Sequence, residues 1–330
     1  SHAMDPAQNG HYFLRVSSAD YRRPDGKRVH TVRDVIVEID RDGRVVDDWR
    51  LMDILDPYRD NVIKTLDQGA VCLNIDASKS GQTLSAEELA KQEASDKFGD
   101  ITGVGAGRNW AHVNSVDYDP SDDSIIISSR HQSACVKIGR DKEVKWILAP
   151  SEGWKNGLEK KLLKPVDKDG RPLKCSSTGD CEGGFDFTYT QHAAWPRASK
   201  NGTIVVFDNG QVRHYEQPAL PEMNYSRVVE YKIDPKTMTV KQTWAYGKDR
   251  GYESFAPITS NAAYQADKDT MFGFYGSVGL FDQTKGTIGR LQEVDYKTGD
   301  VKVEIDVYNN KASAPHYQGH IIDLKQAFAK

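Results

Sequence analysis

Two segments of the chain each bring a histidine to the start of a short strand, and they read like copies of one unit. The first, residues 110–118, contains His112 and Asn114, and the second, residues 189–195, contains His192. Each segment is followed, after a polar turn, by an apolar strand. Side chains two positions apart share one face of a strand, so His112 and Asn114 are expected to point the same way. A repeated unit that carries a histidine each time predicts side chains that converge on a shared axis.

Arg130 ends the strand that follows the first unit, and we expect it to reach back toward the same axis. Its guanidinium is a planar fork of donors that matches a tetrahedral oxyanion. A neutral histidine can attack a phosphorus or sulfur centre, a second one can protonate a leaving oxygen, and an asparagine adds an uncharged donor. These residue types together suit the transfer of a phosphoryl or sulfuryl group. The alternatives are purely structural histidines and a surface position for Arg130.

The pattern of strands predicts an all-β protein. Short runs rich in Val, Ile and Tyr are separated by turn sequences such as those at 41–43 and 297–300. A unit of strand, polar turn and strand recurs four times, and three of the copies end at a tryptophan. Recurrent units of this kind are typical of the blades of a β-propeller. About four blades are recognisable, at residues 9–50, 110–148, 188–247 and 258–307.

Two long insertions interrupt the blades, at about residues 51–109 and 150–187. The first contains a capping-box pattern at 85–90, which predicts a short helix. Long insertions in a regular scaffold serve as lids or binding loops, and plain surface decoration is the alternative. The second insertion carries Cys175 and Cys181, separated by a polar loop. That spacing permits a disulfide and is equally compatible with two free thiols.

Composition argues against several classes of function. The 330 residues carry a net charge of −4, which gives no support for nucleic-acid binding. No apolar run approaches the ~20 residues of a membrane helix, so no membrane insertion is expected. The cysteine spacing does not fit a zinc site, and Cys135 is expected to be a small core residue. Residues 1–6 are interpreted as an expression scar, so a natural leader could have been removed, and residues 7–330 as the propeller region.

Long motifs make the chain similar to a known family. They lie at residues 112–120, 125–133, 145–148, 190–195 and 207–210, and they closely resemble the bacterial PAPS-independent arylsulfate sulfotransferases. The resemblance implies a six-bladed propeller in the periplasm, usually a homodimer, with an additional N-terminal β-domain. It also implies transfer of a sulfuryl group from an aryl sulfate to a phenol, by a ping-pong mechanism through a sulfurylated histidine. Neither the nucleotide donor PAPS nor another cofactor or metal is then expected.

The same resemblance assigns roles to individual residues. His192 matches the nucleophile of the family. His112, Asn114 and Arg130 would hold the sulfuryl oxygens or assist proton transfer. A further family histidine falls near the start of the chain, and His11 is its best match.

The resemblance also implies that Cys175 and Cys181 form the short disulfide of the family, made with the help of disulfide-forming machinery. The chain departs from the family because about four blades are recognisable where the family has six. It therefore looks like the C-terminal part of a larger enzyme, and an arc of four blades leaves sheet edges that the missing part would have to cover. The role of His30 stays open, since it could be structural or catalytic.

Two other functions compete with sulfuryl transfer. The first is a non-catalytic propeller that serves as a binding platform, since a fold alone does not give a function. The second is a metal-dependent propeller hydrolase or lactonase, which would hold a divalent cation with Asp, Glu and Asn ligands in its channel. The channel candidates here are mainly His, Asn and Arg, which argues against the second function.

Overall fold

The computed structural model describes residues 4–7, 10–18, 21–22, 28–29, 33–57, 59, 87, 110–197, 200–216, 220–282, 286–308, 315–322 and 324. Most of the first insertion lies outside these residues, including nearly all of the helix predicted at 85–90, and so do His30 and Cys72. The described part consists mainly of antiparallel sheets, together with α1 (Leu51–Ile54) and several short 3-10 helices.

The first two sheets each contain four strands in chain order. The first is formed by β1 (Met4–Pro6), β2 (Tyr12–Val16), β5 (Val35–Ile39) and β6 (Val45–Arg50). The second is formed by β7 (Val113–Asp119), β8 (Ser124–Ser129), β9 (Ala134–Gly139) and β10 (Val144–Leu148). A separate hairpin, β3 (Tyr21–Arg22) and β4 (Arg28–Val29), lies between β2 and β5 in the chain.

The third and fourth sheets repeat this plan. The third contains β12 (Ala193–Pro196), β13 (Thr203–Asp208), β14 (Arg227–Asp234) and β15 (Thr239–Tyr246). The fourth contains β16 (Asn261–Gln265), β17 (Thr270–Val278), β18 (Ile288–Asp295) and β19 (Val301–Tyr308). Short 3-10 helices occur in the connections at η5 (Arg213–Tyr215), η6 (Pro221–Met223) and η7 (Lys248–Ser254).

The recurrent unit of the sequence corresponds to the outer hairpin of each sheet: β5–β6, β9–β10, β14–β15 and β18–β19. Aspartates close two of the turns. Oδ1 of Asp40 accepts the backbone N–H groups of Asp42 and Arg44 at 2.9 Å each, and Oδ1 of Asp295 accepts that of Lys297 at 3.0 Å. Short side chains that bond the backbone two residues on favour turns, which is why the turn sequences marked these hairpins correctly.

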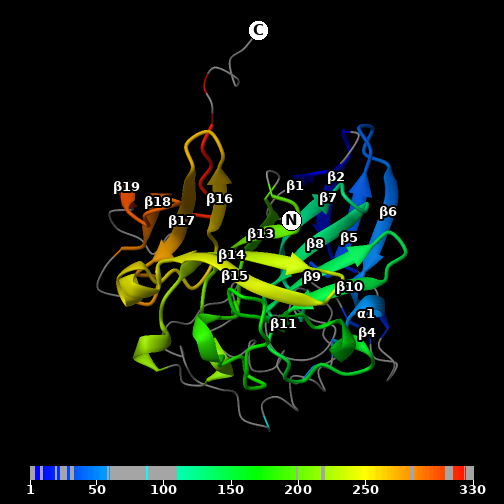
Figure 1. The fold of residues 1–330 in the computed structure, drawn as a ribbon. Helices are drawn as coiled ribbons and strands as arrows, with labels where there is room; N and C mark the ends of the chain where they lie inside the picture. The colour runs from blue at the N-terminus through cyan, green and yellow to red at the C-terminus, as the bar shows by residue number, and fades with distance from the viewer. Residues whose placement is uncertain are drawn as a thin grey trace.

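The sheets follow one another side by side, from the blue sheet through green and yellow to the orange sheet in Figure 1. Their first strands form the inner edge of this array, because β1 contacts β7, β7 contacts β12 and β12 contacts β16. The predicted all-β, propeller-type fold is confirmed, and each predicted blade corresponds to one sheet. No helix in the described residues is long and apolar enough to cross a membrane.

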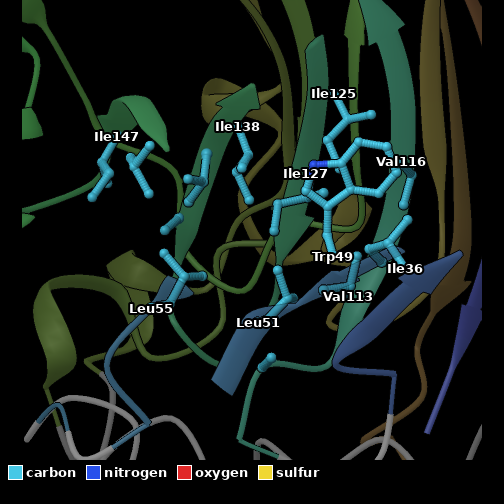
Figure 2. Packing of buried hydrophobic residues seen from close by; sticks show 14 of the residues in the cluster. Ile36, Trp49, Leu51, Leu55, Val113, Val116, Ile125, Ile127, Ile138 and Ile147 are labelled. Atoms are coloured by element: carbon cyan, nitrogen blue, oxygen red, sulfur yellow. The ribbon is translucent and has the colours of Figure 1, made fainter. Parts of the chain in front are cut away.

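Successive sheets pack face to face through separate hydrophobic cores. Ile125 and Ile127 of β8 pack toward the first sheet with Trp49 (Figure 2), whereas Ile126 between them belongs to the core shared with the third sheet. Successive side chains of a strand point to opposite faces, so this alternation shows that β8 is buried on both faces. A third core joins the third sheet to the fourth. The second and third sheets are therefore each packed on both faces.

The second insertion is part of the fold. It contains η3 (Leu158–Lys161), β11 (Lys164–Pro165), which pairs in parallel with β15, and η4 (Glu182–Gly184). Its Phe185 and Phe187 join the core between the second and third sheets. Cys175 and Cys181 form a disulfide, and Cys135 is a free, buried core residue, so both predictions are confirmed.

Residues at the start of the chain belong to the first sheet. Met4–Pro6, interpreted from the sequence as part of an expression scar, form β1 and pair with β2. An oxygen of Asp5 lies 2.8 Å from Nη1 of Arg15. The sheet therefore includes residues that precede residue 7, where the propeller region was expected to begin.

Candidate functional site

The two repeated histidines occupy equivalent places in neighbouring sheets. His112 directly precedes β7 and His192 directly precedes β12, and both are buried. The backbone passes through the left-handed region at His112 (φ 48°), at Thr190 (φ 50°) and at Ser260 before β16 (φ 85°). Such conformations are strained in residues other than glycine, persist only when their surroundings hold them, and cluster at functional sites.

His192 is held at both ring nitrogens. Its Nδ1 lies 2.8 Å from Oδ1 of Asn209, and its Nε2 accepts a hydrogen bond from the backbone N–H of Thr259 at 2.9 Å. The Nδ2 group of Asn209 donates to the carbonyl oxygens of Ala256 at 2.7 Å and of Thr259 at 3.0 Å. Because Asn209 is fully buried, these partners fix the orientation of its amide.

The amide of Asn209 in turn fixes the tautomer of His192. An amide oxygen only accepts, so Nδ1 of His192 carries the hydrogen and Nε2 keeps a lone pair. Exchanging the oxygen and nitrogen of Asn209 would place its oxygen against two carbonyl oxygens, so the opposite tautomer is disfavoured. A neutral ring with a lone pair on Nε2 is the nucleophilic state of a histidine.

His112 lies among positive charges. Its Nδ1 is 3.4 Å from Nη2 of Arg33, and its ring lies 4.4 Å from the ring of His131, centroid to centroid. Burial lowers the pKa of His112 well below its usual value of 6.5, and the charge of Arg33 lowers that pKa further. Charges on His131, Arg130 and His192 lower the pKa of His112 in the same direction. His112 is therefore neutral near pH 7.

Asn114 and Arg130 complete the cluster. Oδ1 of Asn114 accepts a hydrogen bond from Nη1 of Arg33 at 3.0 Å. Arg130 is fully buried just beyond β8, and it donates to the carbonyl oxygen of Thr190 at 2.6 Å and to Oε1 of Gln211 at 2.8 Å. These bonds use two of the five N–H groups of the guanidinium. Arg130 therefore ties the second sheet to the third and brings a fixed positive charge to the site.

The structure brings together four of the five predicted site residues: His112, Asn114, Arg130 and His192. It does not bring His11 to them. Nδ1 of His11 lies 2.8 Å from Oε1 of Glu38, before the first residue of β2, whereas Arg15 near the other end of β2 reaches the carbonyl oxygen of Asn114. Four residues of extended chain separate the two positions by roughly 13 Å. His30 lies outside the described residues.

Asn209 and Arg33 are among the residues of the cluster that were not predicted from the sequence. Asn209 directly follows β13 as Arg130 directly follows β8, so alignment of the second strands of the two units could have indicated it. Arg33 lies two residues before β5 of the first sheet, and its contact with Asn114 of β7 depends on how two sheets pack, for which the sequence carries no local signal.

The donor set of the site suits a tetrahedral oxyanion. Arg33 and Arg130 bring fixed positive charge to the site. The neutral histidines and Asn114 add polar groups, and Asn114 and His112 lie within hydrogen-bonding distance of Arg33. Within the described ranges, no group of three or more His, Cys, Asp or Glu side chains is placed to hold a metal ion.

Sequence comparison relates the chain to known proteins. A family model described as arylsulfotransferase (ASST) matches residues 1–318. An arylsulfate sulfotransferase AssT from Escherichia coli is 56% identical over 329 residues, which cover 99% of this chain and 54% of that protein. The AssT of Lelliottia amnigena is 54% identical over 329 residues, with the same coverage. The chain thus spans about half the length of these curated relatives.

Solved structures show only distant likeness. A catalytically inactive variant of virginiamycin B lyase from Staphylococcus aureus is 8% identical with a TM-score of 0.34, over 96% of this chain and 72% of that one. A periplasmic gluconolactonase from Pseudomonas aeruginosa is 10% identical with a TM-score of 0.31, over 95% and 71%. The relation of this chain to known proteins therefore depends on the sequence matches.

Proposed function

Because the chain belongs to the arylsulfotransferase (ASST) family, we propose that it transfers a sulfuryl group from an aryl sulfate to a phenol, with His192 as the covalent carrier. The observation that carries the proposal is the bond between Nδ1 of His192 and Asn209, which leaves the lone pair on Nε2. The surrounding arginines and Asn114 suit the three oxygens of a sulfuryl group. The transfer uses no PAPS, no other cofactor and no metal.

In the first half-reaction, Nε2 of His192 attacks the sulfur of the aryl sulfate. A nitrogen–sulfur bond forms and the bond from sulfur to the aryl oxygen breaks, so the phenolate leaves and takes up a proton from water. The N–H of Thr259, bonded to Nε2 in the free protein, must release the lone pair for this step. Asn209 then faces the Nδ1–H of a positively charged ring, which its oxygen stabilises.

In the second half-reaction, the oxygen of the acceptor phenol attacks the sulfur of the sulfurylated His192. The nitrogen–sulfur bond breaks, and the proton of the phenol passes to water. Asn114 and Arg130 stabilise the sulfuryl oxygens in both halves. His112 assists as a hydrogen-bond donor, because the lowered pKa of this buried ring makes it a poor source of protons for the leaving oxygen.

The test is incubation with p-nitrophenyl sulfate alone, followed by mass mapping of the modified peptide. We expect one sulfuryl group on His192 and its release when phenol is added, with no PAPS present. His192→Asn should take up none, whereas His320→Asn, which changes an exposed histidine, should behave as the parent chain. Sulfurylation at another residue would remove His192 from this role. Absence of sulfate uptake both in the folded chain and in a chimera that restores the full length of the relatives would favour the binding platform.

The part of the relatives that this chain does not cover can be included in the same test. A chimera in which this chain replaces the corresponding part of the Escherichia coli relative can be compared with the chain alone. We propose that the chain works as part of a longer enzyme, whose further sheets cover the half-exposed apolar row of β19, formed by Val301, Val303, Ile305 and Val307. Transfer by the chimera and not by the chain alone would agree with this.

We further propose a periplasmic location, assembly as a homodimer, and oxidation of Cys175 and Cys181 by disulfide-forming machinery. The disulfide supports the location, since disulfides persist in oxidising compartments. The homodimer and the machinery are supported by the family resemblance alone. Sedimentation of the longer protein and alkylation of its cysteines after periplasmic extraction test these points.

A further inference from the structure

Arg33 contacts two residues of the neighbouring sheet at once. We propose that Arg33 is a positioning residue that holds His112 and Asn114 as hydrogen-bond donors toward the sulfuryl group, an inference that rests on the proposed function. Nη1 of Arg33 donates to Oδ1 of Asn114 at 3.0 Å, and Nη2 lies 3.4 Å from Nδ1 of His112. Arg33 is buried, so water does not compete strongly for these contacts.

A guanidinium donates and never accepts, and this decides the state of both partners. Oδ1 of Asn114 must face Arg33, which turns the Nδ2 group of Asn114 away from it. That Nδ2 atom is buried and has no hydrogen-bond partner in the described part of the protein. Nδ1 of His112 must offer its lone pair to Arg33, so the hydrogen of the neutral ring lies on Nε2. Asn114 thus keeps an N–H group for a ligand, and the N–H of His112 lies on the ring nitrogen that faces away from Arg33.

The first sheet also holds the backbone that carries these side chains. The carbonyl oxygen of Arg33 accepts the N–H of Val113 at 3.3 Å, and Nη1 of Arg15 donates to the carbonyl oxygen of Asn114 at 2.9 Å. Arg33 itself has a left-handed backbone, with φ 51°. A residue other than glycine keeps such a conformation only where its surroundings enforce it. The start of β7 is therefore held from the first sheet through both main chain and side chains.

His112 and His192, at equivalent positions in neighbouring sheets, are thereby held in opposite tautomers. Asn209 accepts from His192, so the hydrogen of that ring lies on Nδ1 and the lone pair on Nε2. Arg33 donates to His112, so the hydrogen of that ring lies on Nε2. One ring can attack sulfur and the other can donate to an oxygen. Burial and the charge of Arg33 both lower the pKa of His112, which keeps it neutral for this role.

Ring-nitrogen NMR of the chain labelled with 15N-histidine tests the assignment without any need for activity. The His112 signals are identified by their loss in His112→Gln. We expect the Nε2–H tautomer in the parent chain and a mixture of tautomers in Arg33→Met, which keeps an unbranched apolar stem but has no donor. Arg44→Met, a change at an arginine side chain that is 76% exposed in the turn between β5 and β6, should leave the signals unchanged.

Arg33→Lys gives a second variant in case Arg33→Met does not fold. Lysine keeps the charge but lacks the fork, so we expect it to hold Asn114, the partner at the shorter distance, and to leave the His112 tautomer mixed. In an active protein, both variants should lower kcat about 10- to 100-fold, with a much smaller change in KM for the donor.

The Nδ1–H tautomer in the parent chain, or unchanged His112 signals in a folded Arg33 variant, would overturn the proposal. A fixed Nε2–H tautomer in a protein that never transfers sulfate would instead remove the proposed function and leave the assignment of Arg33 to His112 intact.

Discussion

The hydroxyl of Tyr189 donates to the carbonyl oxygen of Thr178 at 2.6 Å, and this bond joins the disulfide loop to the segment that carries His192. Thr178 lies between Cys175 and Cys181, and Tyr189 lies three residues before His192. Tyr189 is buried, and its backbone N–H is bonded to Oδ1 of Asp208 at 2.8 Å. The loop closed by the disulfide therefore helps to fix the chain that leads into the site.

Cys181→Ser should lower both stability and transfer. Opening a loop this short removes roughly 2 kcal/mol of stabilisation. Transfer should fall as well, because Thr178 no longer holds Tyr189 in place. Denaturant unfolding and p-nitrophenyl sulfate turnover measure the two effects. Dithiothreitol should reproduce both in the parent chain and add nothing in Cys181→Ser; full activity of the reduced parent would show that the loop does not support the site.

Asn209→Ala should slow sulfuryl uptake about 100-fold, because the His192 ring loses the partner that fixes its orientation and tautomer. Rapid-mixing measurement of p-nitrophenol release in the first turnover isolates this half-reaction. Asn201→Ala, at an exposed turn position, is the matched control and should react like the parent chain. An unchanged first turnover in folded Asn209→Ala would mean that other contacts orient His192.

The sheets could be predicted because their signals are local. A strand buried on both faces, such as β8, reads as an apolar run, and an aspartate such as Asp40 closes a turn through its own neighbours. The predicted blade at residues 110–148 matches the sheet from β7 to β10 closely. The positions of His112 and His192 follow from the same repeat.

The partners of these histidines could not be predicted in the same way. Arg33 reaches His112 across 79 positions of the chain, through a contact between two sheets. Asn209 acts on His192 only because the loop at 256–259 fixes its amide. His11 was expected at the site from the family resemblance, yet β2 begins directly after it and carries the chain toward the site only four residues later. Local patterns give strands, whereas side-chain partners come from packing.

Glu230 on β14 offers a test of stability, because its side chain is fully buried and forms ion pairs with Arg197 and Lys200. Burial alone would raise the pKa of Glu230, but hydrogen bonds from Thr243, Tyr296, Lys200 and Arg197 outweigh it and hold the pKa below its usual value of 4.5. This contribution is therefore present above pH 4.5 and is lost as the pH falls through the folded-state pKa.

Glu230→Gln should cost about 3 kcal/mol at pH 7, because it leaves the partly buried Arg197 without its charged partner. The loss should shrink at acid pH, where the parent glutamate is itself protonated. Urea unfolding at pH 7 and below pH 4 measures the difference, with Glu143→Gln, at an exposed position, as the control. An equal loss at both pH values would mean that packing, and not charge, accounts for the effect.

Asp117 on β7 has the opposite dependence on pH. Burial raises the pKa of Asp117 from 3.8 to about 7, and the backbone N–H of Tyr118 offsets this only in part. Because the unfolded chain loses this proton near pH 4 and the folded chain keeps it until about pH 7, stability falls as the pH rises between these values. The complete loss is at most about 4 kcal/mol.

Asp117→Asn removes this penalty, so it should raise the melting temperature at pH 8 and change it little at pH 4. Calorimetry at both values, with Asp141→Asn at an exposed turn for comparison, decides the matter: a variant equally stable to the parent at pH 8 would show that Asp117 ionises without penalty in the folded chain.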